Sequence, residues 1–281
     1  MTELDTSERR PFVAITLIVL ATQAPYLFFT PGKHDPQALP VYGLLAGLLA
    51  LVLDRPARLA DVGITTRGLM RGVSWLVLAL IAWALPLFVG WRLGWIEISD
   101  GVDRGAPDLM RAFVGRAALL VAAVVLGDEL AWRGVLLGDA RARWGRARAI
   151  ALVAVLSSLY RLPLLARVGM IDDAYAGGEI WLRELARALA LGILFDRVRN
   201  LWLTGALALA FFASPVLVLG NAEDPFEPLY FYAGDGRRFV AVTWLADVLP
   251  LVALAAAALA SRERPRARAA SLTASDTATD P

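Results

Sequence analysis

Long apolar stretches separated by short polar connections run through most of the chain. A helix needs about 20 mostly apolar residues to cross the hydrocarbon core of a bilayer. Five stretches meet this requirement, and the last of them contains one interior charge, Asp247. The five stretches are 11–29, 36–53, 72–91, 200–220 and 239–260. Each is predicted to form a membrane-spanning helix.

Three further stretches are apolar enough to span a membrane only if a few charges are tolerated. They cover residues 112–138, 149–166 and 180–195 and follow one another along the chain. The third is the weakest, because Arg183, Glu184 and Arg187 interrupt it. Charged side chains inside a span usually face a bundle interior or a water-filled cavity. The grouping therefore predicts that these three helices share a polar interior.

Basic residues are concentrated in alternate connections, as expected for segments that face the cytoplasm. Arginines mark the N-terminus, the second, fourth and sixth connections and the stretch after Ser261, whereas the intervening connections are acidic or mixed. The alternation holds throughout only if the weak stretch 180–195 is counted as a span. We therefore predict an all-α bundle of about eight transmembrane helices in the cytoplasmic (inner) membrane, with both termini in the cytoplasm.

The composition supports one membrane domain and excludes several kinds of site. Of the 281 residues, 58% are hydrophobic, against roughly 45–50% in an ordinary soluble domain. A net charge of +2 without basic runs that carry aromatics indicates no nucleic-acid partner. The absence of cysteine excludes disulfides and thiolate chemistry. We expect a single transmembrane domain over residues 1–260, followed by a disordered cytoplasmic tail, 261–281, that is too polar to order itself.

The most informative segment is 127–137, which reads Gly-Asp-Glu-Leu-Ala-Trp-Arg-Gly-Val-Leu-Leu. Glu129 and Arg133 are four residues apart, so on a helix they share one face and can pair. Asp128 points about 100° away from Glu129 on a helix with 3.6 residues per turn. Charges at this depth in a span are functional candidates. Asp128, Glu129 and Arg133 are thus our candidate catalytic residues.

This segment resembles the Glu-Glu-x-x-x-Arg motif of the CPBP family, which contains the CAAX prenyl proteases and the bacteriocin-processing proteins. The likeness extends over about residues 110–215. Ser157-Ser-Leu-Tyr160 falls where the family has its Phe-x-x-x-His helix, and the segment that begins at Asn200 resembles the start of its His-x-x-x-Asn helix. The resemblance implies a CPBP-protease-like core and an intramembrane peptidase ancestry.

The motif positions that carry histidine and asparagine in the family are occupied by other residues here. Tyr160 stands in place of phenylalanine, and Leu164 (or Leu165, if the alignment shifts by one) takes the place of the first histidine. Ala208 takes the place of the second histidine and Phe212 that of the asparagine. The resemblance implies that Asp128 replaces the first family glutamate, the proposed base, and that Glu129 and Arg133 match the second glutamate and the arginine.

The loss of histidine bears directly on catalysis. Hydrolysis in the family depends on a water polarised by a glutamate and histidines, or by a metal that they hold. A transition-metal site favours imidazole or thiolate ligands, and the chain contains a single histidine, His34, in the first predicted connection. We therefore expect no metal and no cofactor.

An arginine is expected to occupy the polar interior in place of the missing histidines. Arg161 lies in mid-span beside Tyr160, and both are candidates for lining a polar cavity. Because a buried carboxylate needs a partner, Arg161 is predicted to neutralise Asp128 or Glu129. Glu184 and Arg187, three residues apart, are predicted to pair within their own helix.

We interpret the chain as a catalytically degenerate relative of the CPBP proteases that acts as a scaffold, partner or substrate-holding module. Its expected partners are the lipid bilayer and either another membrane protease or a membrane-anchored protein tail. The alternative is an active glutamic-type intramembrane endopeptidase that cleaves the C-terminal tails of membrane-anchored proteins. Whether the chain is an enzyme stays open, with inactivity favoured. A third hypothesis, a small-molecule transporter, lacks the inverted repeat typical of that class.

Overall fold

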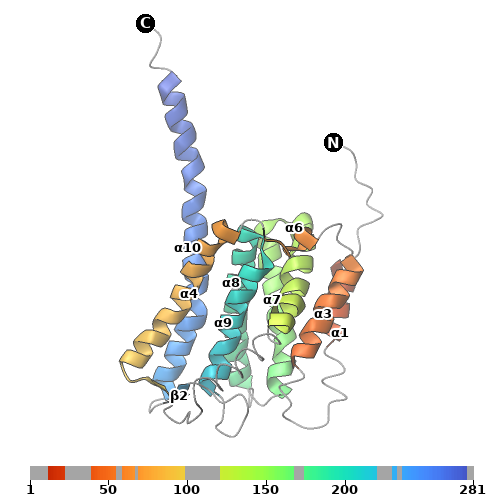
Figure 1. The fold of residues 1–281 in the computed structure, drawn as a ribbon, viewed down its shortest axis with the longest axis vertical. Helices are drawn as coiled ribbons and strands as arrows, with labels where there is room; N and C mark the ends of the chain where they lie inside the picture. Colours follow the sequence, from red (N-terminus) through yellow and green to blue (C-terminus); the bar gives the residue numbers. More distant parts are fainter. Residues whose placement is uncertain are drawn as a thin grey trace.

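The chain folds into a bundle of helices (Figure 1). The computed structural model describes residues 12–22, 39–54, 59–66, 69–98, 121–167, 174–219, 230–232 and 236–276. Its helices are α1 (Phe12–Ala21), α3 (Leu39–Asp54), η3 (Leu59–Val62), α4 (Leu69–Arg92), η4 (Val121–Leu136), α6 (Leu137–Trp144), α7 (Arg146–Arg167), α8 (Ala174–Val198), α9 (Leu201–Leu219) and α10 (Gly236–Asp276).

The all-helical class predicted from the sequence is confirmed. Each of the eight apolar stretches contains at least part of one of these helices. Residues 11, 23–29, 36–38, 112–120 and 220 of these stretches lie outside the described residues. The helices form because each stretch combines apolar side chains with few residues that break a helix, and α7 continues through its internal Pro163.

Membrane-spanning potential is clearest in two of the described helices. The segments Gly72–Arg92 and Val240–Ser261 are long and apolar enough to cross a bilayer, with mean hydropathies of 2.2 and 2.0. Three shorter apolar helical segments accompany them, Phe12–Ala21, Leu44–Leu53 and Leu201–Phe211. The described residues thus supply two such helices by length and composition, so eight crossings are not confirmed by this criterion.

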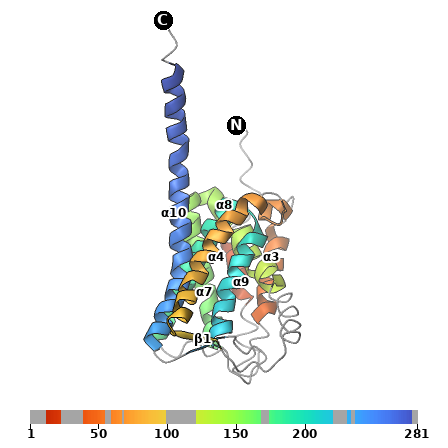
Figure 2. The same ribbon diagram turned by 60° about the vertical axis from the view of Figure 1, so that its left-hand side comes forward.

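The C-terminal end differs from the sequence prediction. We expected a disordered tail over 261–281, but α10 continues as a helix to Asp276. Arginine and alanine are frequent between residues 261 and 270, and both are good helix formers. Because this part of α10 follows a long apolar helix, it can continue without a new nucleation step. Figures 1 and 2 show α10 extending well beyond the other helices at one end of the bundle.

A short strand pair lies at the opposite end of the bundle, and the sequence did not predict it. Strand β1 (Ile96–Ile98) pairs antiparallel with β2 (Tyr230–Tyr232), with Glu97 opposite Phe231. Strand β1 closely follows α4, and β2 closely precedes α10. The pair therefore fastens two helices that also pack along their lengths, as Figure 2 shows.

Helix η4 lies in the core of the bundle and contains the motif. It packs against α3 and α9, and Leu130, Trp132 and Leu136 on it are almost completely buried. Its backbone is a π-helix, a form with i→i+5 hydrogen bonds that mostly occurs as single turns and often at functional sites. A second apolar cluster, which includes Leu191, Leu207 and Leu254, joins α4, α8, α9 and α10. The motif side chains are therefore enclosed by neighbouring helices.

Candidate functional site

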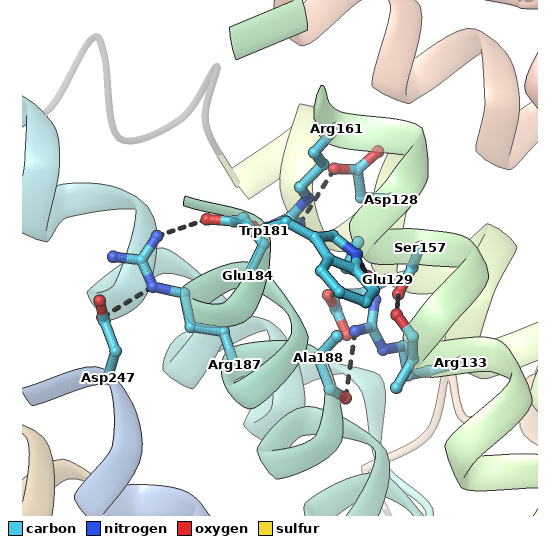
Figure 3. Close-up of polar contacts among 12 residues, drawn as sticks. Asp128, Glu129, Arg133, Ser157, Arg161, Trp181, Glu184, Arg187, Ala188 and Asp247 are labelled. Atoms are coloured by element: carbon cyan, nitrogen blue, oxygen red, sulfur yellow. Dashed lines mark hydrogen bonds and ion pairs between the residues drawn. The ribbon is translucent and has the colours of Figure 1, made fainter. Parts of the chain in front are cut away.

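The motif glutamate and arginine form a buried ion pair within η4. Arg133 Nη1 donates to Glu129 Oε1 over 3.2 Å, and the residues are 0% (Glu129) and 1% (Arg133) exposed. Arg133 Nη2 also donates to the carbonyl oxygen of Ala188 in α8, at 3.4 Å. The pairing predicted from the four-residue spacing is therefore confirmed. Figure 3 shows the two side chains between η4 and α8.

Three polar atoms on this turn of η4 are buried without a hydrogen-bond partner among the described residues. They are Glu129 Oε2, Arg133 Nε and Trp132 Nε1. Buried polar groups in folded proteins are nearly always satisfied. The second carboxylate oxygen of Glu129 is thus an acceptor that the described side chains leave open.

Asp128 pairs with Arg161 from α7. Arg161 Nη2 lies 3.2 Å from Asp128 Oδ2, and the two side chains are 22% (Arg161) and 19% (Asp128) exposed. Arg161 Nη1 donates to Glu184 Oε2 in α8 at 3.0 Å. These distances confirm the predicted partnership of Arg161 with Asp128, whereas Glu129 is paired with Arg133. One guanidinium therefore bridges carboxylates from η4 and α8.

The ion pairs continue from α8 into α10, a connection that the sequence analysis missed. Arg187 Nη1 donates to Glu184 Oε1 at 2.6 Å, which confirms the predicted pair within α8. Arg187 Nε donates to Asp247 Oδ1 at 2.7 Å, and Arg183 Nε donates to Asp247 Oδ2 at 2.6 Å. Asp247 is completely buried. Two arginines four residues apart on α8 thus hold the carboxylate of α10 from both sides.

We call these eight side chains the charged network. Its members are Asp128, Glu129, Arg133, Arg161, Arg183, Glu184, Arg187 and Asp247. Four carboxylates face four guanidinium groups, so the formal charges cancel. Removing one partner of a buried pair commonly costs about 3–5 kcal/mol, because it leaves a charge without compensation. The network therefore ties η4, α7, α8 and α10 together while keeping the interior neutral.

Tyr160, the second residue predicted to line a polar cavity, contacts an aromatic ring and a hydroxyl group. Its ring contacts the Trp132 ring edge-on, with centroids 5.3 Å apart, and its hydroxyl lies 3.2 Å from that of Thr22. The neighbouring Ser158 bonds the carbonyl oxygen of Val155 and accepts a hydrogen bond from Trp181 Nε1 at 3.0 Å. This part of α7 is therefore used for helix packing.

The positions that correspond to the family histidines are described in part. Ala208 is buried in the apolar cluster with Leu207 and Phe211. The side chains of Leu164, Leu165 and Phe212, and the whole of His34, lie outside the described residues. Ala208 offers no ligand or base at the place where the resemblance implies a histidine.

The donor set around the motif does not fit a transition metal. Among the residues that the structure describes, no group of three or more His, Cys, Asp or Glu side chains comes close enough to hold a metal ion. The carboxylates of Asp128 and Glu129 are already paired with arginines. A cation would have to compete with two guanidinium groups that keep their charge at any ordinary pH.

Comparison with protein families agrees with the motif. Residues 110–212 match the family model described as type II CAAX prenyl endopeptidase Rce1-like. The match confirms the resemblance to the CPBP and CAAX proteases over 103 of the 281 residues, close to the predicted core of 110–215. Comparisons with curated proteins and with solved structures found no match.

Proposed function

We propose that this chain is a catalytically inactive, membrane-embedded relative of the CAAX-type proteases that serves as a scaffold, partner or substrate-holding module. The main support for this proposal is that both motif carboxylates form ion pairs with arginines. Asp128 is held by Arg161 and Glu129 by Arg133, each at 3.2 Å. At the second family histidine the chain has Ala208.

The ion pairs argue against hydrolysis by the family mechanism. A general base must reach the proton that it removes within hydrogen-bond distance, and here one oxygen of each motif carboxylate already accepts from an arginine. The chain also has no histidine apart from His34. A base that is tied to a guanidinium, without an imidazole beside it, is poorly placed to drive water onto an amide.

We further infer that the bundle crosses the cytoplasmic membrane eight times, with both termini in the cytoplasm. Apolar side chains on the outside of the bundle support this inference. On α4, Val77, Ile81, Leu85 and Phe88 are between 44% and 59% exposed and recur every three or four residues. Such a stripe at helical spacing fits contact with lipid chains better than contact with water. The alternation of arginine-rich and acidic connections sets the orientation.

In the substrate-holding role, a partner would bind at the part of the charged network that is accessible from outside the bundle. Asp128 and Arg161 are about one fifth exposed, whereas Asp247 and Glu129 are fully buried. A membrane-anchored C-terminal tail or a second membrane protease would meet the network at this pair. Such a partner would be bound beside the motif without being cut.

A fluorescent, lipid-anchored tail peptide tests this role in proteoliposomes that contain the full chain. We expect the peptide to bind, to be recovered intact and to bind equally well to the Glu129→Gln variant. The matched control is the same lipid anchor without a peptide. Peptide binding no stronger than that of the bare anchor would contradict the substrate-holding role.

The second candidate is the active endopeptidase, which one observation favours. Glu129 Oε2 has no hydrogen-bond partner among the described residues, so it is free to accept a hydrogen bond from a water. This candidate predicts that the chain cleaves the tail peptide and that Glu129→Gln abolishes the cleavage. The two candidates therefore give opposite results with the same peptide and the same variant.

A further inference from the structure

Three arginines from separate elements lie at the end of the bundle where α10 extends beyond the other helices. Arg141 is in α6, Arg146 begins α7, and Arg199 follows α8 directly. Figure 1 shows α6 at this same end. The C-terminal end of α8 also lies there, because Arg197 donates to the carbonyl oxygen of Ala258 in α10. The three residues are up to 58 positions apart in sequence, so the fold brings them together.

One carboxylate, that of Asp196 in α8, faces these arginines. Arg141 Nη1 donates to Asp196 Oδ1 at 2.7 Å, and Arg146 Nε pairs with Asp196 Oδ2. The side chain of Asp196 is 3% exposed, whereas those of Arg141 and Arg146 are 39% and 29% exposed. Three positive charges against one negative charge give the cluster a formal charge of +2.

Asp196 neutralises the charge of Arg199 less than those of Arg141 and Arg146, with which it forms ion pairs. Burial and the like charges of Arg141 and Arg146 lower the pKa of Arg199, and Asp196 opposes this only in part. Its guanidinium lies over the Phe195 ring, 5.6 Å from the centroid. Its backbone has a φ of 49°, which is uncommon for a residue other than glycine. The fold thus holds a surface arginine beside two others of the same sign.

The surroundings of the cluster are typical of a membrane interface. Trp144, at the end of α6, is 41% exposed, and Trp202, at the start of α9, is 39% exposed. Tryptophan is enriched at the level of the lipid headgroups. The predicted topology places the same end of the bundle in the cytoplasm, where the leaflet carries anionic lipids.

We propose that Arg141, Arg146 and Arg199 bind the phosphate of an anionic phospholipid headgroup. The proposal depends on the membrane placement given under the proposed function, but not on whether the chain hydrolyses peptides. A phosphate matches the planar, forked donors of arginine and neutralises the surplus charge of the cluster. Trp144 and Trp202 are close in sequence to Arg146 and Arg199, and exposed tryptophans are typical of the level of the lipid headgroups.

Native mass spectrometry of the full chain in detergent tests the proposal. The protein is titrated with phosphatidylglycerol, phosphatidylcholine or inorganic phosphate, and the bound molecules are counted. We expect the wild type to prefer phosphatidylglycerol. Arg199→Gln should weaken that binding about tenfold, because it removes hydrogen bonds to a charged group, which contribute about 1.5 kcal/mol. Arg148→Gln, which removes an exposed arginine from the first turn of α7, is the matched control and should leave the preference unchanged.

Three results would overturn the proposal. Equal binding of phosphatidylglycerol and phosphatidylcholine would show that no anionic site exists. Equal losses for Arg199→Gln and Arg148→Gln would show a diffuse charge effect instead of a site. Saturation by inorganic phosphate that prevents lipid binding would assign the cluster to a soluble anion. Carbonate extraction of cell membranes tests the membrane placement separately, because a chain released by carbonate is not embedded, whatever lipids it binds.

Discussion

At the scale of single residues, the chain keeps the charges of a protease motif and pairs them with one another. Glu129 and Arg133 pair within one helix, whereas Asp128 reaches Arg161 across a helix interface. Arginine is well suited to this role, because it stays charged when buried and offers several donors. The motif positions therefore contribute to the stability of the bundle whatever their effect on chemistry.

The Asp128–Arg161 pair is expected to be energetically coupled. Arg161→Leu leaves the carboxylates of Asp128 and Glu184 facing each other without their common partner, so it should lower the free energy of unfolding by about 3 kcal/mol. The double variant Asp128→Asn, Arg161→Leu should lose at least about 1 kcal/mol less unfolding free energy than the sum of the losses of the two single variants. Unfolding in detergent micelles measures these values.

The control for this cycle is the pair of Arg143 with Asp139, which lie four residues apart on α6 with side chains 26% and 24% exposed. Their contact of 3.1 Å joins no second helix. Pairs of this spacing within one helix contribute little, commonly about 0.3–0.5 kcal/mol. Nearly additive losses for Asp128 and Arg161, like those expected for the pair on α6, would mean that the observed contact does not stabilise the fold.

The sequence predicted some of these contacts and not others, for a physical reason. Pairs three or four residues apart follow from helix geometry, so Glu129–Arg133 and Glu184–Arg187 were predictable. The contact of Asp247 with Arg183 and Arg187 spans about 60 positions and depends on how α8 packs against α10. A lone carboxylate in an apolar span still signals that a buried cation must exist somewhere, and that signal was present in the sequence.

At the scale of helices, the close contact between α3 and η4 positions the motif. A methyl group built on Gly47 would meet the oxygen of Gly127 at 2.7 Å and its Cα at 2.8 Å. Both are backbone atoms that cannot move without displacing η4. The small residues at this crossing therefore let the two backbones approach, as is common between membrane helices.

Gly47→Ala is expected to be strongly destabilising for this reason. The added methyl group must separate α3 from η4, which should lower the free energy of unfolding by about 3 kcal/mol. Gly178 in α8 is the matched control, since a methyl group there meets nothing within 4 Å. Gly178→Ala should leave stability unchanged or raise it by up to about 1 kcal/mol. Thermal unfolding of both variants in detergent checks the difference, and equal melting temperatures would contradict the close crossing.

Helix positions were largely predictable, and the exceptions have local causes. Runs of apolar residues indicate the helices, because a segment in apolar surroundings must satisfy its backbone hydrogen bonds internally. The pairing of β1 with β2 brings together segments that are more than 130 residues apart, and no local pattern announces it. The extension of α10 past Ser261 reflects helix propensity in a stretch whose composition alone suggested disorder.

At the scale of the whole molecule, the proposed topology makes a direct prediction about the connections. The chain has no cysteine, so single cysteines can be introduced without background. Arg143 lies in α6, at the predicted cytoplasmic end, and Glu97 lies in β1, at the opposite end. Each is replaced by cysteine in a separate variant. In intact cells a membrane-impermeant maleimide should label Glu97→Cys, and it should label Arg143→Cys only after permeabilisation. The reverse pattern would invert the orientation, and labelling of both would contradict the membrane placement.

We propose that Glu129, the motif glutamate of this chain, does not take part in peptide hydrolysis. The most direct measurement is the rate at which proteoliposomes of the wild type and of Glu129→Gln release a C-terminal fragment from the lipid-anchored tail peptide. The same rate is expected for both proteins and for liposomes without protein. A general base commonly contributes at least about a hundredfold in rate. A wild-type rate about a hundredfold above that of Glu129→Gln would therefore establish an active protease that uses this glutamate.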